Sequence, residues 1–206
     1  PLIPDARGFI FDLDGTLLYL PVDWSDLRKQ LKSIAKVSYE VQPIFQTLEK
    51  IIGERPELRE PLFQKIDEFE LQAAAKAELR EGSAGVLKLL GESCDLSLVT
   101  MQGRTVTEHL FESLRLKNYF SSSFTRDISL DRAKQLELAL AGMKLSRKDV
   151  VFVGDRINDL NAARKVGVRF VLVRGRMDDV DPEVSYPSMN ALLAALRSDG
   201  PVRVLG

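Results

Sequence analysis

The sequence has few of the residues that form covalent cross-links or histidine-based metal sites. Its one cysteine, Cys94, cannot form an internal disulfide, and its one histidine, His109, has no second imidazole with which to share a metal ion. No run of apolar residues approaches the roughly 20 that span a bilayer. The net charge is -1, which gives no overall field for a nucleic-acid polymer or an anionic membrane. These absences argue against a disulfide-stabilised domain, a membrane protein and a binder of nucleic-acid polymers.

The composition is that of a soluble globular protein that is large enough to bury a core. Of its 206 residues, 45% are hydrophobic and 29% are charged, which lies within the ordinary range. The first residues, PLIPDARGFIF, lack the basic and then apolar arrangement of a signal peptide. Together with the single cysteine, this favours a cytoplasmic protein. We expect a monomer or a weak homodimer, a choice that the sequence does not decide.

Short apolar runs rich in branched and aromatic residues recur along the chain. Runs of this kind are typical of strands that are buried on both faces of a parallel sheet. They occupy residues 8–11, 96–99, 150–153 and 168–173, with a weaker candidate at 119–125. Helical patterns occupy residues 103–116, 133–143, 157–167 and 188–197. This βαβ order predicts an α/β fold with a Rossmann-like, doubly wound parallel sheet.

The interval from Leu17 to about Arg80 has helical periodicity and no strand-like run. Apolar residues share one face in each of three segments: Trp24, Leu27, Leu31 and Ile34; Val41, Ile44, Phe45, Leu48 and Ile52; Leu62, Ile66, Phe69, Ala73 and Ala77. A helical block inserted after the first strand lies near the sheet edge where such folds bind ligands. We therefore expect a core domain of residues 1–16 and 81–206, and a small helical cap domain of residues 17–80.

Carboxylates follow two of the predicted strands. In FIFDLDGT, Asp12 and Asp14 project from the carboxyl end of the first strand, and Gly15 permits backbone conformations that other residues resist. In GDRIND, Asp155 lies at a strand end and Asp159 on the first turn of the following helix. Neighbouring carboxylates are tolerated when a divalent cation neutralises them, and Mg2+ prefers a few carboxylates together with water and substrate phosphate. The pattern therefore predicts a Mg2+ site formed by these four acids in one crevice.

A phosphate group beside these acids needs positive charge and hydrogen-bond donors. Thr100 ends the run LSLVT, where its hydroxyl and the following backbone N–H groups, that of Met101 among them, can bind phosphate oxygens. Lys134 begins the helix before the VVFV strand and is the best-placed lysine. Thr100, Met101 and Lys134 are therefore the predicted phosphate-binding residues.

These motifs and their order resemble those of the haloacid dehalogenase (HAD) superfamily phosphatases, among them phosphoglycolate phosphatase-like members. The resemblance covers residues 8 to about 175 and rests on DLDGT at 12–16, Thr100, Lys134 and GDRIND at 154–159. It implies a HAD-like core with a cap inserted after the first strand. It also implies that Asp12 is the nucleophile and Asp14 the general acid and base.

The resemblance gives the remaining residues their roles too. Thr100 and Lys134 are implied to hold the phosphoryl group, and the acids of GDRIND to complete the Mg2+ site. Gln135 follows Lys134 at a position where relatives often carry proline. Arg132 is for this reason an alternative to Lys134 as the cation that contacts the phosphoryl group.

The resemblance implies a Mg2+-dependent phosphatase that hydrolyses a small phosphate monoester through a phospho-aspartate on Asp12. Asp14 argues against a dehalogenase, because a leaving halide needs no acid. A phosphomutase that uses the same site is the alternative reaction. A receiver-like signalling module, which also phosphorylates an aspartate beside Mg2+, is the non-enzymatic alternative. Phosphoglycolate, sugar phosphates and nucleotides all remain open as substrates, and the acids at 176–181 are interpreted as solvated loop residues.

Overall fold

A parallel sheet forms the centre of the molecule, which the computed structural model describes over residues 5–173 and 184–198. The sheet has six strands in the order β5-β4-β1-β6-β7-β8, and each neighbouring pair is parallel. The strands are β1 (Gly8–Phe11), β4 (Asp95–Val99), β5 (Ser122–Phe124), β6 (Val150–Gly154), β7 (Arg169–Val173) and β8 (Val184–Tyr186). All the strands expected from the apolar runs are therefore present.

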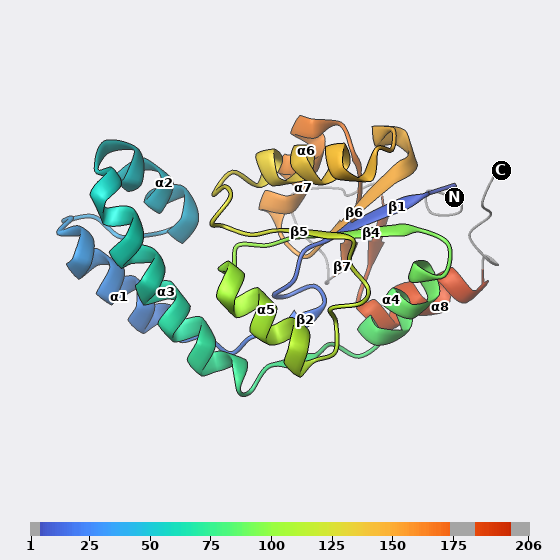
Figure 1. The fold of residues 1–206 in the computed structure, drawn as a ribbon, viewed down its shortest axis with the longest axis horizontal. Coiled ribbons are helices and arrows are strands. Elements are labelled where there is room, and N and C mark those ends of the chain that lie inside the picture. Colours follow the sequence, from blue (N-terminus) through green and yellow to red (C-terminus); the bar gives the residue numbers. More distant parts are fainter. Residues whose placement is uncertain (1–4, 174–183, 199–206) are drawn as a thin grey trace.

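Helices cover both faces of this sheet, which confirms the doubly wound α/β fold (Figure 1). On one face lie α6 (Arg132–Met143) and α7 (Ile157–Val166), and on the other α4 (Ser83–Gly91), α5 (Arg104–Ser113) and α8 (Met189–Ser198). The expected helices at 103–116, 133–143, 157–167 and 188–197 correspond to α5, α6, α7 and α8. The sequence patterns did not single out α4 or the edge strand β8.

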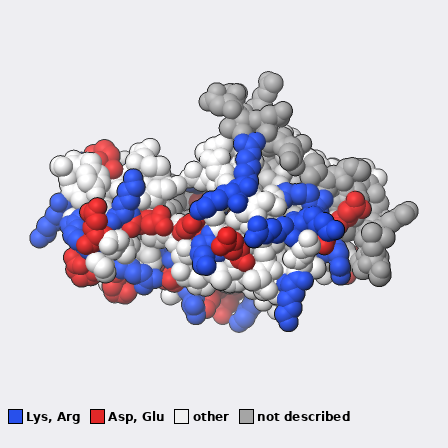
Figure 2. Space-filling model, turned by 90° about the horizontal axis from the view of Figure 1, so that it is seen from above, with Lys and Arg blue, Asp and Glu red and all other residues white. Residues whose placement is uncertain are grey.

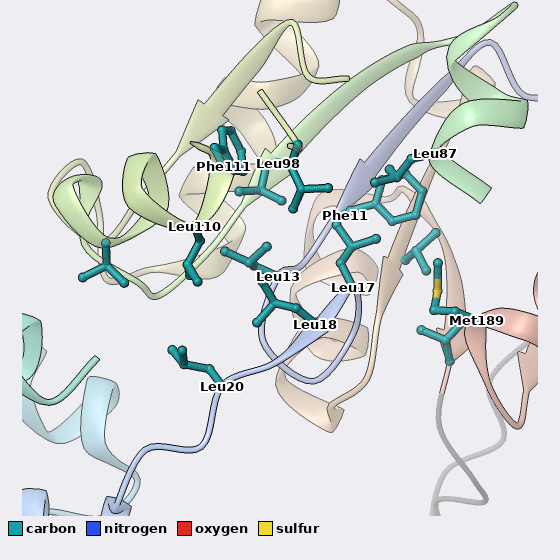
Figure 3. Packing of buried hydrophobic residues seen from close by; sticks show 14 of the residues in the cluster. Phe11, Leu13, Leu17, Leu18, Leu20, Leu87, Leu98, Leu110, Phe111 and Met189 are labelled. Atoms are coloured by element: carbon teal, nitrogen blue, oxygen red, sulfur yellow. The ribbon is translucent and has the colours of Figure 1, made fainter. Parts of the chain in front are cut away.

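The two cores follow from the alternation of side chains along each strand. Phe9 and Phe11 of β1 pack with α4, α5 and α8, whereas Ile10 faces the other way and packs with α6 and α7. Both sets are buried, which explains why β1 reads as a continuous apolar run. The loop that follows β1 is anchored in the first core by Leu13 and Leu17 (Figure 3).

Three helices lie beyond one end of the sheet (Figure 1). They are α1 (Trp24–Ala35), α2 (Ile44–Glu54) and α3 (Arg59–Ala74), with a short 3-10 turn, Pro56–Leu58, between the last two. Where the chain leaves the core and returns to it, β2 (Leu18–Tyr19) pairs antiparallel with β3 (Glu78–Leu79). We expected no strand in this interval, because two residues are too few to produce a recognisable pattern. The described residues contain no helix that is long and apolar enough to cross a membrane.

The surface carries charges of both signs, interspersed over the face seen in Figure 2. This distribution agrees with the near balance of 29 basic and 30 acidic residues. The acids at 176–181, which we interpret as solvated, lie outside the described residues.

Candidate active site

The candidate site lies where three neighbouring strands end. β1 pairs with β4 on one side and with β6 on the other, so their carboxyl ends share one edge of the sheet. Asp12 follows β1, Thr100 follows β4 and Asp155 follows β6. The sheet order extends in opposite directions from β1, and open α/β sheets bind ligands at such a switch point.

Three carboxylates meet at this edge. Asp12, Asp155 and Asp159 each offer an oxygen within 4.8 Å of the others, and all three residues are buried. We call these residues the acid cluster. Burial raises the pKa of Asp12 well above its usual range, while the Arg132 guanidinium acts in the opposite direction and the neighbouring acids add to the rise. Burial likewise raises the pKa of Asp159.

The acid cluster fits a divalent cation such as Mg2+. Carboxylate oxygens are the ligands that Mg2+ prefers, and like charges this close need a counter-charge to stay ionised. Arg132 pairs with the cluster through both Asp12 and Asp159, and Arg156 lies 3.8 Å from Asp155, so two cations face three carboxylates and an excess of negative charge remains. The donor set therefore suits a magnesium ion.

Two glycines let the backbone approach the acid cluster. Gly15 has a φ of 94°, and a Cβ placed there would fall on the Asp155 carboxylate. A Cβ at Gly154 would lie 2.8 Å from the Cβ of Asp159. This close approach explains the glycine in each of the two acidic motifs.

Arg132, and not Lys134, reaches the acid cluster. Arg132 is the first residue of α6, and its guanidinium lies 2.8 Å from Asp12 and 3.2 Å from Asp159. Lys134 is exposed and does not line the cavity described below. Two residues along a helix correspond to a rotation of about 200°, so the two side chains leave opposite faces of α6. The structure thus brings the alternative cation into the site, and not the one we preferred from the sequence.

The Asp14 carboxylate lies apart from the acid cluster, unlike its expected place among the metal ligands. Its Oδ1 accepts a hydrogen bond from the backbone N–H of Leu20 at 3.0 Å, and its Oδ2 lies 4.0 Å from Arg156. The chain folds back after Gly15, which brings Leu20 beside Asp14. Burial raises the pKa of Asp14, opposed by the Leu20 hydrogen bond. Asp14 is thus set apart from the cluster, and its pKa is higher than that of an exposed aspartate.

Thr100 and Met101 lie at the end of β4, as expected, but in different surroundings. Thr100 is fully buried and its hydroxyl donates to the side chain of Gln102, whereas Met101 lines the cavity. Gln135 fixes this strand end to α6, because its amide nitrogen donates to the Thr100 carbonyl oxygen at 2.9 Å. The residue noted as a departure from the family pattern thus holds α6 against the end of β4.

A cavity of about 280 Å³ joins the strand ends to the helices α1 and α2. Asp12, Asp14 and Arg132 line it from the core. From the other side it is lined by Trp24 of α1 and by Phe45, Gln46 and Glu49 of α2. Arg156, which lies within the GDRIND motif, also lines the cavity, although we did not predict it as a site residue.

A family model described as haloacid dehalogenase-like hydrolase matches residues 9–173. Among curated proteins, none matches the chain.

Solved structures share the fold at low sequence identity. A HAD phosphatase from Thermococcus onnurineus is 20% identical with a TM-score of 0.67, over 96% of this chain and 100% of the other. CbbY from Rhodobacter sphaeroides, solved in complex with phosphate, is 15% identical with a TM-score of 0.65, over 91% and 96%. L-2-haloacid dehalogenase from Xanthobacter autotrophicus is 14% identical with a TM-score of 0.66, over 94% and 99%. The same fold thus occurs in proteins named for different reactions.

Proposed function

Because the chain belongs to the haloacid dehalogenase-like hydrolases, we propose that it hydrolyses a small phosphate monoester, with Mg2+, through a phospho-aspartate on Asp12. The observation that carries this proposal is the pair of aspartates in one cavity with different surroundings. Asp12 belongs to the acid cluster and is ion-paired with Arg132 at 2.8 Å, while Asp14 lies apart from the cluster and accepts a hydrogen bond from the Leu20 N–H at 3.0 Å. Two carboxyl groups with separated environments suit a nucleophile and a general acid.

In this proposal the acid cluster holds Mg2+, which would offset the repulsion between its carboxylates and the phosphoryl group. Arg132 faces the same carboxylates and supplies a fixed positive charge next to Asp12. Thr100 and Met101, at the end of β4, are the proposed hydrogen-bonding partners of the phosphoryl oxygens. The proposed partner is a small phosphorylated metabolite.

The reaction proceeds in two steps. A carboxylate oxygen of Asp12 attacks phosphorus while the ester P–O bond breaks, and Asp14 gives its proton to the leaving alkoxide. Asp14, now ionised, accepts a proton from the water that hydrolyses the acyl phosphate and frees Asp12. Burial raises the pKa of Asp14, which is the direction that the first step requires.

The three alternatives, a dehalogenase, a receiver-like module and a phosphomutase, differ from a phosphatase in their residues, their fold or their products. A dehalogenase needs no general acid for a halide, so Asp14 in the cavity has no role in that reaction. A receiver-like module predicts no helical insertion after the first strand, whereas α1, α2 and α3 lie between β1 and β4. A phosphomutase would give an isomer when incubated with a sugar monophosphate and its bisphosphate activator. We expect inorganic phosphate instead.

The direct test is phosphate release from 4-nitrophenyl phosphate in the presence of Mg2+. We expect phosphate release that depends on Mg2+ and stops when EDTA is added. Activity that EDTA leaves unchanged would refute the magnesium-dependent mechanism. Halide release from a 2-haloacid without any phosphatase activity would place the chain with the dehalogenases instead.

We expect Mg2+ to stabilise the fold because it binds three carboxylates that are brought together only by folding. At 100 times its dissociation constant the ion should contribute about 2.7 kcal/mol, which raises the unfolding temperature of a chain this size by about 5 to 10 °C. Asp155→Asn should abolish this rise in a thermal melt. Asp149→Asn, before the amino end of β6, is the matched control and should keep it. An equal rise in both variants would contradict a metal site at the acid cluster.

The charge that α1 and α2 present to the cavity favours a neutral or positively charged alcohol in the substrate. Among the lining residues from the helices α1 and α2, Glu49 is the one with a charge, and Trp24 and Phe45 are aromatic. Carboxylates repel a second anion, and aromatic rings attract a cation. We therefore propose that phosphoethanolamine or glycerol phosphate is a better substrate than phosphoglycolate.

This preference should weaken when the Glu49 charge is removed. Glu49→Gln is expected to raise kcat/KM for phosphoglycolate relative to glycerol phosphate by about fivefold, the effect of one unit charge at short range in water. Glu54→Gln, on the same helix and outside the cavity lining, is the control. A wild-type preference for phosphoglycolate, or an unchanged ratio in Glu49→Gln, would contradict the charge argument.

A further inference from the structure

A buried ion pair links α3 to the loops that follow β4 and β5. The Arg126 guanidinium lies 2.8 Å from the Glu70 carboxylate, and neither side chain is exposed to solvent. Arg126 also pairs with Asp67 and donates to the Met101 carbonyl oxygen at 2.7 Å. α3 is therefore fixed to the loop that begins at the phosphate-binding end of β4.

A chain of hydrogen bonds leads from this ion pair to the Thr100 hydroxyl. The side-chain nitrogen of Gln102 donates to Glu70 over a long 3.5 Å contact. The Thr100 hydroxyl donates to the side-chain oxygen of Gln102, and the Gln102 backbone N–H donates back to the hydroxyl at 3.2 Å. All three residues are buried, and Gln102 also lines the cavity.

The pattern of donors and acceptors makes the hydrogen bond donated by Thr100 depend on the protonation state of Glu70. An ionised carboxylate only accepts, so it attracts the amide nitrogen of Gln102 and turns the amide oxygen towards Thr100. An amide oxygen also only accepts, so the Thr100 hydroxyl must donate its single proton to the Gln102 oxygen. A neutral group at position 70 can instead donate a hydrogen bond to the amide oxygen of Gln102. The Gln102 amide can then rotate so that its nitrogen faces Thr100, and the Thr100 hydroxyl is free to donate to another acceptor.

We propose that Glu70 is a positioning residue whose charge, acting through the Gln102 amide, decides whether the Thr100 hydroxyl donates to Gln102 or to the phosphoryl group. The inference rests on the proposed function, in which Thr100 faces the phosphoryl group. It adds a control of phosphate binding that originates in the inserted helix α3.

The surroundings of Glu70 place its titration near neutral pH. Burial raises the pKa of Glu70 to about 7, opposed by Arg126 and reinforced by Asp67. These are the charged groups that face the carboxylate, from the loop after β5 and from α3 itself. The loop after β4 presents the neutral Gln102 and the Gly103 N–H. The protonated fraction of Glu70 falls as the pH rises through 7. The Thr100 hydroxyl therefore donates its proton to the ligand at pH values below 7.

The test uses inorganic phosphate as a competitive inhibitor of 4-nitrophenyl phosphate hydrolysis. Glu70→Gln keeps the shape of the side chain and is neutral at every pH. At pH 8 it should bind phosphate about tenfold more tightly than the wild type, the effect of one added hydrogen bond to a charged acceptor. At pH 6 the ratio of the two inhibition constants should approach one. Taking the ratio cancels the titration of the ligand and of the acid cluster.

Two further variants complete the experiment. Glu68→Gln, exposed on the same helix and paired with Lys65, is the matched control and should equal the wild type at both pH values. Gln102→Leu cuts the link without touching the ion pair and should reproduce Glu70→Gln, which keeps the proposal testable if the latter does not fold. A ratio that does not change with pH, or weaker phosphate binding in Glu70→Gln or Gln102→Leu, overturns the inference. Absence of any phosphatase activity in the wild type would instead overturn the proposed function.

Discussion

Asp12→Asn should lower phosphate release by at least about 10,000-fold, because the amide cannot attack phosphorus and no acyl phosphate forms. The Asn oxygen can still accept a hydrogen bond from Arg132, which lies 2.8 Å from Asp12, so the local structure should persist. Phosphate release from 4-nitrophenyl phosphate measures the loss. The matched control is Asp5→Asn, at the opposite end of β1, which should retain full activity.

The Asp12→Asn variant also distinguishes a catalytic role of Asp12 from a role in stabilising the fold. Burial and nearby acids raise the pKa of Asp12, so the ionised carboxylate is unfavourable in the metal-free fold. A neutral amide removes this repulsion, and without Mg2+ the variant should unfold at the same temperature as the wild type or higher. Substantial activity in a folded Asp12→Asn protein would exclude the nucleophile assignment. A strong loss of stability would instead assign Asp12 a structural role.

Asp14→Asn should slow hydrolysis of an alkyl phosphate by about 100- to 10,000-fold, the usual range for general acid–base catalysis. The Asn oxygen can still accept the Leu20 N–H, so the loop after Gly15 keeps its course. An alkoxide needs a proton to leave, whereas 4-nitrophenolate leaves without one. The first step with the aryl ester should therefore stay fast while the second, which needs a base for water, becomes slow.

This difference gives a kinetic signature. With 4-nitrophenyl phosphate, Asp14→Asn should release a burst of one nitrophenolate per enzyme molecule and then continue slowly as the acyl phosphate persists. Stopped-flow absorbance measures the burst, and a glycerol phosphate assay measures the loss for an alkyl ester. Equal losses for both esters without a burst would show that Asp14 does not act as the acid and base.

Much of the fold could be predicted because its strands are buried on both faces. Such strands read as continuous apolar runs, and residues 8–11 and 150–153 were recognisable for that reason. The edge strand β8 and the two-residue strands β2 and β3 were not, since short or exposed strands leave too weak a pattern. The helix α4 was also missed, although Val86, Leu87 and Leu90 form its buried face.

The sequence by itself determined that Asp12 and Asp155 would meet, whereas it wrongly placed Asp14 in the same cluster. Asp12 and Asp155 each follow a buried parallel strand, and the carboxyl ends of such strands share one sheet edge. Residues at the ends of neighbouring parallel strands lie close together however far apart they are in the sequence. The glycines beside them also follow from the sequence, because only glycine allows the acid cluster to approach the backbone.

Only the tertiary structure decided which cation reaches these acids and what holds the end of β4. Arg132 and Lys134 are two residues apart, and the docking of α6 against the sheet determines which of them faces the site. The link from Glu70 to Gln102 joins residues 32 positions apart whose side chains are neighbours only after α3 packs against the core. Local spacing fixes which face of an element a side chain occupies, whereas packing between elements fixes what that face meets.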